Sequence, residues 1–251
     1  RSFSLDSGRA RRVVLILTER CNLACSYCYA GQGAYGKGSS NRIQDRQINS
    51  ILSYLERVFP LGIENLQFFG GEPLLEPRAI RSICERSSRY ASIKGSSLSV
   101  VNNGTVLSES ILQVLTTYHV AVTISLDGPA KFHDLYRVFK HGGHGSFKIV
   151  TRNIERMASA GVPVAIQLTV SPTMVDAHAQ GHFNVDEFSD LLASAGVRYV
   201  HLSPVIDVIG GEFSFSEQQL QYLDDFQAQI INALYVRGLM SNAVVEHISF
   251  S

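Results

Sequence analysis

The sequence predicts an α/β fold in which a parallel β-sheet curls into a partial (β/α)6 barrel. Strand-like apolar runs alternate with amphipathic helical stretches from residue 12 to about residue 235, and this alternation is typical of a parallel sheet. No two runs are joined by a short hairpin signal. Right-handed crossovers are expected to curve six such units into part of a barrel, and 251 residues are enough for one.

Each element is predicted from its own periodicity. Short apolar runs bounded by turn residues are typical of buried strands, and apolar residues recurring every three to four positions indicate helices that cover a sheet. Gly161 and Gly196 follow two of the helical stretches, where a C′ glycine is expected. The predicted strands are 13–17, 65–69, 97–101, 120–126, 162–170 and 199–202, and the predicted helices are 43–59, 78–93, 108–118, 147–160, 184–195 and 216–235.

The composition excludes several function classes. Lys plus Arg and Asp plus Glu both number 22, so the formal net charge is zero and nucleic acid is not expected as a general partner. No apolar stretch approaches the roughly 20 residues of a membrane span, and the first residues lack the apolar region of a signal peptide. A cytoplasmic protein without a membrane partner is expected.

Three divisions of the chain are expected. Residues 1–11 form an N-terminal segment, and residues 12–237 form the barrel. Residues 238–251 are expected to begin a C-terminal extension that is cut short, since the chain does not begin with Met and ends on an apolar stretch.

A cluster of cysteines follows the first predicted strand. Cys21, Cys25 and Cys28 fall within eight residues, and the chain has only four cysteines. Three thiolates at this spacing can each bind one iron of a [4Fe–4S] cluster and leave the fourth iron open, as a catalytic site requires. A structural zinc site normally uses four protein ligands, and a disulfide would leave an odd thiol. These two alternatives are less favoured.

A second motif follows the second strand, in Phe68–Pro73. Gly70 and Gly71 would let the backbone approach a ligand closely, and Glu72 can accept charge-assisted hydrogen bonds from an ammonium group. The alternative is a tight strand-to-helix turn with a solvated Glu72.

Polar residues also end or interrupt later strands. Arg137, downstream of Ser125 and Asp127, has a planar fork that matches a carboxylate, although a surface salt bridge is the alternative. Asp127 is expected to order its loop. Asn102 ends the third predicted strand, just before the turn signal Asn-Gly. Gln167 lies among apolar neighbours, where a polar side chain needs a partner; a ligand is one candidate partner, and a satisfied core amide is the alternative.

The cysteine loop and the Gly-Gly-Glu-Pro run resemble the motifs of the radical S-adenosylmethionine (SAM) superfamily, including the aromatic Tyr27 before the last cysteine. The resemblance implies a [4Fe–4S] cluster on Cys21, Cys25 and Cys28 whose open iron chelates SAM. One electron then cleaves SAM, and the resulting 5′-deoxyadenosyl radical abstracts hydrogen from a substrate.

The same resemblance implies a SAM site built from several strand ends. Glu72, with Gly70 and Gly71, would hold the amino group, and Ser125 and Arg137 the carboxylate. The residues implied for the rest of the SAM site are Tyr27 at the cluster loop, Asn102 and Gln167 near the ribose, and the backbone at Leu202 beside the adenine.

Within the superfamily, the chain is similar to peptide-modifying maturases that carry a SPASM or twitch extension. The similarity rests on residues 28–36, the run from Ser125 to Pro129, and residues 143–147. It implies a ribosomally made precursor peptide or protein as substrate and a reductant such as flavodoxin or ferredoxin. The chain departs from this pattern because no cysteine follows Cys84.

Three functions are open at this point. The chain is expected to abstract hydrogen from a peptide residue and install a thioether or carbon crosslink. It could instead be an anaerobic sulfatase-type maturase that forms formylglycine, or a catalytically silent barrel that serves as a binding module.

Overall fold

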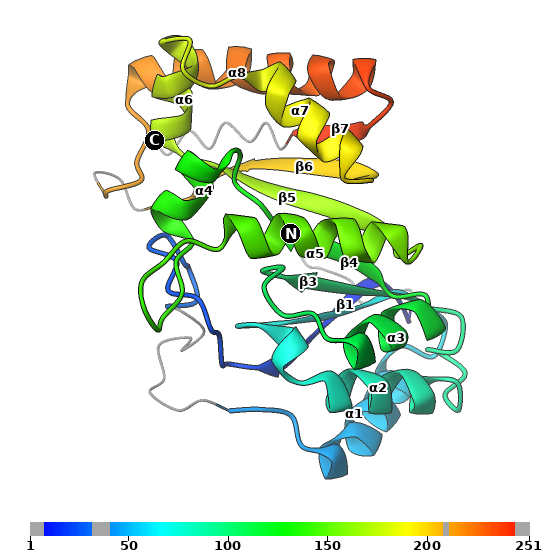
Figure 1. The fold of residues 1–251 in the computed structure, drawn as a ribbon. Coiled ribbons are helices and arrows are strands. Elements are labelled where there is room, and N and C mark those ends of the chain that lie inside the picture. Colours follow the sequence, from blue (N-terminus) through cyan, green and yellow to red (C-terminus); the bar gives the residue numbers. More distant parts are fainter. Residues whose placement is uncertain (1–7, 32–40, 208–210, 244–251) are drawn as a thin grey trace.

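The protein folds around one seven-stranded sheet whose strands are hydrogen-bonded in chain order (Figure 1). The computed structural model describes residues 8–31, 41–207 and 211–243. Every neighbouring pair of strands is parallel, which confirms the predicted α/β class. The strands are β1 (Arg9–Thr18), β2 (Gly62–Gly70), β3 (Ser97–Asn102), β4 (Ala121–Ser125), β5 (Val164–Val170), β6 (Tyr199–Pro204) and β7 (Met240–Ala243).

The connections between strands are helical. Ser108, Asn184 and Ser216 each cap a helix, since their side chains accept a hydrogen bond from a backbone N–H of the first turn. The helices are α1 (Asp45–Val58), α2 (Pro77–Ser87), α3 (Glu109–Thr117), α4 (Ala130–Tyr136), α5 (Phe147–Ser159), α6 (Pro172–Ala179), α7 (Val185–Ser194) and α8 (Glu217–Val236), with a 3-10 turn, η1, at Pro73–Leu75.

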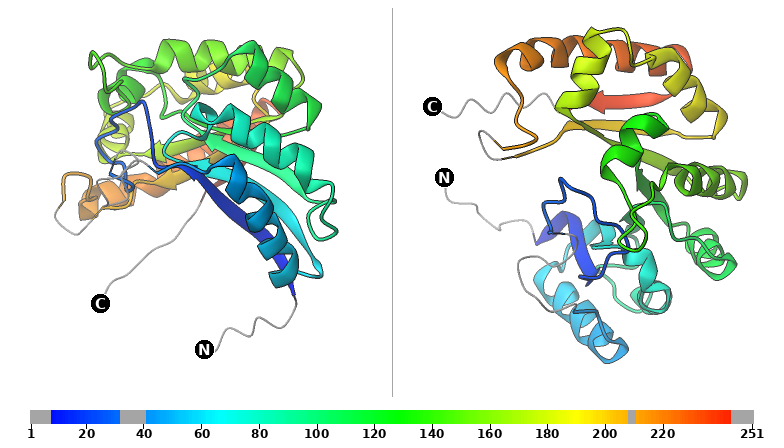
Figure 2. Two further views of the ribbon diagram at one scale, coloured as in Figure 1. Left: turned by 90° about the horizontal axis from the view of Figure 1, so that it is seen from below. Right: turned by 60° about the vertical axis from the view of Figure 1, so that its left-hand side comes forward.

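The sheet is curved, with its helices on the outer face, and it stays open between β1 and β7 (Figure 2). Alternate strand residues such as Phe68, Ile124 and Ile166 are fully buried in one apolar core with helix residues such as Leu52 and Met157. The residues between them point to the other face and are only half-buried. That face is therefore accessible to a ligand.

The structure adds elements that the sequence did not predict. Strand β7 pairs with β6 and lies inside the range 238–251 that was expected to begin an extension; the domain division itself stays a prediction. Helices α4 and α6 were missed because seven and eight residues show little helical periodicity. Helix α2 ends at Ser87, because residues 88–95 form turns instead of the predicted last helical turns.

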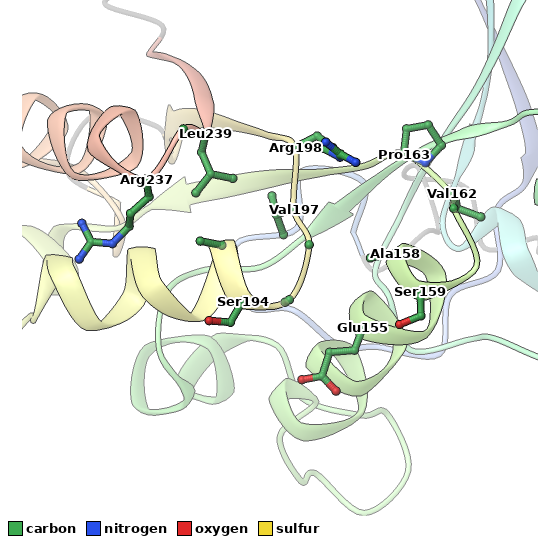
Figure 3. Close-up of a pocket in the computed structure, with 15 residues that line it drawn as sticks. Glu155, Ala158, Ser159, Val162, Pro163, Ser194, Val197, Arg198, Arg237 and Leu239 are labelled. Carbon is green, nitrogen blue, oxygen red and sulfur yellow. The ribbon is translucent and has the colours of Figure 1, made fainter.

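The two poles of the sheet differ. Loops at the carboxyl ends of the strands carry all the predicted motifs, as is general for α/β folds. The amino pole holds a hollow of about 910 Å³ (Figure 3). It is lined by the ends of α5, α7 and α8, where Gly161, Gly196 and Gly238 take left-handed φ values of 78°, 79° and 72°. This hollow lies away from the predicted chemistry.

No helix in the described part of the chain combines the length and the apolar character that crossing a membrane requires.

Candidate functional site

The cysteine loop is anchored to the chain that follows α4. The backbone N–H of Ala24 donates to the carbonyl of Val138 at 2.8 Å, and the N–H of Lys140 donates to the carbonyl of Asn22 at 3.0 Å. An isolated antiparallel bridge joins Leu23 to Phe139. The loop is thus held by backbone bonds independently of its three thiols.

The three thiols of this loop are free and half-buried, and the chain directs hydrogen-bond donors toward two of them. Cys21 Sγ lies 3.4 Å from the backbone nitrogen of Leu23 and 3.7 Å from Asn103 Nδ2. Cys25 Sγ lies 3.9 Å from Arg137 Nη1. Donors around cysteine sulfurs stabilise negative charge on them, and such contacts tune iron–sulfur clusters. The donor set therefore fits a thiolate-bound cluster.

Burial raises the pKa of the Cys25 thiol to about 11, although the nearby Arg137 opposes this shift. A free thiol here is protonated at neutral pH, and metal binding removes that proton. Among the described residues, no three His, Cys, Asp or Glu side chains are gathered so as to hold one metal ion. Three ligands that bind three different irons need not converge on a single point.

The two glycines of the second motif are required because the backbone there packs closely against the residues that lead from β1 into the cysteine loop. A Cβ on Gly70 would lie 2.3 Å from the carbonyl oxygen of Thr18, and one on Gly71 would lie 2.4 Å from that of Arg20. Two backbone bonds reinforce the contact: Gly71 N–H donates to Thr18 and Glu72 N–H to Arg20, at 2.8 and 2.7 Å. The close approach seen here is between two strand ends.

Glu72 is completely buried, so it is not the solvated side chain of the alternative reading. Its carboxylate accepts hydrogen bonds from two backbone N–H groups, those of Leu74 at 2.8 Å and Asn103 at 2.7 Å. Burial raises the pKa of Glu72 to about 7, and these bonds offset only part of the shift. No ion pair within the described residues involves it. A buried carboxylate without a cation is suited to a positively charged or donor ligand.

Asn103 joins the motifs, although it was not among the predicted site residues. Its backbone binds Glu72, and its Nδ2 lies 2.9 Å from Asn22 Oδ1 as well as near Cys21. Its Oδ1 accepts bonds from the N–H and the hydroxyl of Thr105. Its sequence signal is the turn pair Asn103–Gly104 at the end of a strand, and the ligand contact was predicted for the neighbouring Asn102 instead.

Asp127 and Arg137 form a buried ion pair, with Nε and Oδ2 2.6 Å apart and side-chain exposures of 2% and 9%. This excludes the surface salt bridge considered for Arg137. Asp127 also accepts from the Tyr27 hydroxyl and from the N–H of Thr169, at 3.0 Å for the latter. It therefore orders the loop, as expected, and ties β4 to β5 and to the cysteine loop.

Tyr27, between two cluster cysteines, is enclosed by aromatic and cationic groups. Its ring makes edge contacts with Tyr136 and Phe213, at centroid distances of 5.8 and 5.7 Å, and the Arg137 guanidinium lies 5.3 Å from its centroid. Burial raises the pKa of Tyr27 well above its usual value. The hydroxyl therefore stays protonated and can only donate to Asp127.

Ser125 and Gln167 lie side by side on the accessible face. They are register partners on β4 and β5, and Gln167 is in turn the register partner of His201 on β6. All three are half-buried. Neither Ser125 nor Gln167 makes a side-chain hydrogen bond to another described residue. Their polar groups are available to a ligand, and Gln167 is not a satisfied core amide.

Asn102 and Leu202 are buried, in contrast to Ser125 and Gln167. The Asn102 amide is buried and bonded locally, to the carbonyl of Thr123 at 3.2 Å and the N–H of Gly104 at 2.8 Å. The side chain thereby orders the turn, and its predicted contact with a ribose is not favoured by this position. Leu202 is fully buried in the core, so only its backbone is left for the predicted ligand contact.

The fold and the site together define a class of protein: an open parallel barrel that presents three thiols and a buried carboxylate at the carboxyl ends of its strands, as an iron–sulfur enzyme with a small charged ligand would. A sequence model of the radical SAM superfamily matches residues 15–185. The chain therefore belongs to the radical SAM superfamily, whose cofactors are a [4Fe–4S] cluster and SAM.

Two curated relatives illustrate the breadth of the similarity. The sporulation killing factor maturation protein SkfB of Bacillus subtilis is 26% identical over 247 residues, which cover 97% of this chain and 54% of SkfB. Human molybdenum cofactor biosynthesis protein 1 is 30% identical over 212 residues, which cover 81% of this chain and 30% of the human protein. The chain thus spans about half the length of SkfB and less of the human protein.

Among solved structures, the chain is similar to anSMEcpe with bound AdoMet, with a TM-score of 0.76 and 18% sequence identity. The match covers 94% of this chain and 64% of that structure. At this identity the likeness establishes the barrel fold alone.

Proposed function

We propose that this chain is the catalytic barrel of a radical SAM maturase that abstracts hydrogen from a residue of a ribosomally made peptide and installs a thioether or carbon crosslink. The observation that carries the proposal is that Asn103 bonds to the buried carboxylate of Glu72 and approaches Cys21, the first of three free thiols in one loop. This arrangement places a metal-binding loop and a site for a charged ligand side by side.

Cys21, Cys25 and Cys28 would hold the cluster. When bound, the cluster and SAM supply reductive cleavage of SAM and removal of a hydrogen atom from the substrate. The chain's own part is to bind and orient. Glu72, with the backbone at Gly70 and Gly71, would receive the SAM amino group.

Other residues of the same pole would complete the SAM site. Arg137 holds Asp127 through Nε and, at 3.5 Å, through Nη2, and it reaches Cys25 with Nη1; further N–H groups of its guanidinium remain for a carboxylate. Ser125 would bind the same carboxylate. Gln167 would bind hydroxyls of the ribose, and the backbone at Leu202 the adenine.

A peptide substrate is supported by the relatives. SkfB is named as the maturation protein of a killing factor, and anSMEcpe has been solved with AdoMet and a peptide called Cp18Cys. The sheet is open between β1 and β7, which is compatible with a substrate as large as a peptide. A one-electron reductant such as flavodoxin or ferredoxin, in a reducing cytoplasm, would suit three free thiols.

The first test is whether anaerobically reconstituted protein, given dithionite and SAM, releases 5′-deoxyadenosine. We expect release from the wild type and none from Cys25→Ala. A protein that takes up iron and sulfide but releases no 5′-deoxyadenosine would instead be a silent barrel.

The second test concerns the bond made. The chain is co-expressed with a peptide encoded beside its gene, and the peptide is analysed by mass spectrometry. A crosslink removes two hydrogens and gives fragments that stay joined, whereas formylglycine from cysteine replaces the thiol with an aldehyde. The aldehyde result would favour the sulfatase-type alternative.

A further inference from the structure

A chain of hydrogen bonds links the backbones of Asp127 and Arg137 through two buried side chains outside the proposed SAM contacts. The backbone nitrogen of Asp127 lies 3.2 Å from His133 Nδ1, and His133 Nε2 lies 2.9 Å from Ser146 Oγ. Ser146 Oγ lies 2.8 Å from the carbonyl oxygen of Arg137. His133 and Ser146 are both 0% exposed.

The chemistry of the two ends fixes the direction of every bond. A backbone N–H can only donate, so Nδ1 of His133 must be the unprotonated nitrogen. In the neutral ring Nε2 then carries the hydrogen and donates to Ser146. The Ser146 hydroxyl in turn donates to the Arg137 carbonyl, which can only accept. Burial lowers the pKa of His133 to about 4, which keeps the ring neutral as this pattern requires.

Ser146 lies at the N-cap of α5, where a serine side chain ordinarily caps the helix. Its side chain, however, accepts no such bond from the first turn. Asp134 takes over part of this task, since its Oδ1 accepts from the N–H of Phe147 at 2.8 Å. The Ser146 hydroxyl is thereby released for the bond to Arg137.

The link bears directly on the ion pair. Arg137 is the C-cap of α4, with φ −103° and ψ 78°, so its N–H still donates to the His133 carbonyl at 2.9 Å, whereas its own carbonyl has left the helical pattern. Within the described part of the chain, the Ser146 hydroxyl is the side-chain group that donates to this carbonyl. The guanidinium beyond it reaches Asp127 and Cys25, so a shift of this backbone moves the group beside the cluster loop.

We propose that His133 and Ser146 are positioning residues that fix Asp127 and Arg137 beside Cys25 and thereby set the affinity for SAM. The effect on SAM rests on the proposed function, whereas the hydrogen-bond chain does not. Neither residue is expected to touch a cofactor.

The first experiment examines the hydrogen-bond chain without any cofactor. Nitrogen-15 NMR of histidine-labelled, cluster-free protein reports which ring nitrogen of His133 carries the hydrogen, with Ser146→Ala used to identify the affected signal. We expect an unprotonated Nδ1 and a protonated Nε2 at neutral pH. A protonated Nδ1, or a charged ring, would overturn the proposal.

The second experiment compares Ser146→Ala with Ser189→Ala in anaerobically reconstituted protein. Ser189 is a matched control, because it is also 0% exposed and its hydroxyl also donates to a backbone carbonyl at 2.8 Å, that of Val185 within α7. We expect Ser146→Ala to raise the Kd for SAM about tenfold, which corresponds to about 1.4 kcal/mol, and Ser189→Ala to change it less than twofold.

A merely structural role predicts another pattern, in which the two alanine variants lose similar stability to urea and leave SAM affinity equally unchanged. That result would overturn the proposal. His133→Asn provides a second variant, since its Oδ1 can still accept from Asp127 while the link to Ser146 is lost; its Kd should rise as for Ser146→Ala. A wild type that takes up cluster but fails to bind SAM would refute the proposed function and the affinity effect together, and the NMR result would still decide the hydrogen-bond chain.

Discussion

Asn103 donates its backbone N–H to Glu72 Oε2 at 2.7 Å and so brings the end of β3 against the turn that follows β2. The same residue directs its side-chain amide toward Cys21 Sγ at 3.7 Å. One residue therefore contacts both a predicted cluster ligand, Cys21, and a predicted SAM ligand, Glu72. We expect that a displacement of the cysteine loop shifts the turn that carries Glu72, and the reverse.

The pKa of Glu72 gives a pH dependence of stability. Burial raises the pKa of this carboxyl from its ordinary value of 4.5 to about 7 in the folded protein. Below pH 4.5 both states carry the proton; between the two values the unfolded chain releases it first, so stability falls as pH rises. The loss is on the order of 3 kcal/mol and is complete above pH 7.

Urea unfolding of the cluster-free protein at several pH values measures this loss. Glu72→Gln cannot titrate, so its stability should lack that part of the slope between pH 4.5 and 7, whatever its absolute level. Equal slopes for the two proteins would show that Glu72 is not a buried acid of raised pKa.

Removing only one partner of the Asp127–Arg137 ion pair should strongly lower the free energy of unfolding. Asp127→Ala leaves the Arg137 guanidinium buried and without its carboxylate, which should lower the free energy of unfolding by about 3–5 kcal/mol. Glu109→Ala, which removes the partner of Arg156 at the surface, is the control and should cost far less, because Glu109 is 83% exposed. Similar losses in urea unfolding would contradict the importance of burial.

Substitution of a cluster cysteine should remove the metal. Cys25→Ala should abolish the brown absorbance and the bound iron and sulfide, since three thiolates are the minimum anchor. Cys84→Ala is the matched control, because Cys84 is a buried thiol of α2. A full complement of iron and sulfide in Cys25→Ala would disprove the ligand assignment.

Gly71→Ala should destabilise the protein through steric overlap. The added Cβ would lie 2.4 Å from the Arg20 carbonyl oxygen and 2.7 Å from its carbon, and relief of such overlap costs about 1–3 kcal/mol or more. Gly95→Ala, where nothing lies within 4 Å, should be neutral. Thermal unfolding of both variants checks the contrast, and an unaffected Gly71→Ala would refute the close packing of the two strand ends.

The sequence predicted most of the fold because its strands and longer helices have clear periodicity. Strand β5 alternates perfectly between buried and half-buried residues, and α1 and α5 have well-separated faces. Strand β7 has four residues, too few for a pattern to stand out, and it was missed. Pairing with β6 stabilises it, which is a tertiary effect invisible in a local window.

The site was predicted in outline for a related reason. The cysteines and Glu72 are recognisable by residue type and spacing, whereas Asn103, His133 and Ser146 act through bonds between residues far apart in the chain. Asn102 and Asn103 illustrate the limit. Two adjacent identical residues take different faces of the strand end, and only the three-dimensional register shows which one contacts the cysteine loop.

The open sheet has a mechanical consequence. Strands β1 and β7 each have one strand neighbour within the described residues, whereas β3, β4 and β5 have two. A closed barrel has a fixed circumference, but an open one can widen by flexing at its margins. The outer strands can thus move apart to admit a large substrate. The inner strands, with Asn103 and Asp127 at their ends, keep these polar groups in place. Hydrogen exchange should accordingly be fastest at the two margins and slowest in β4.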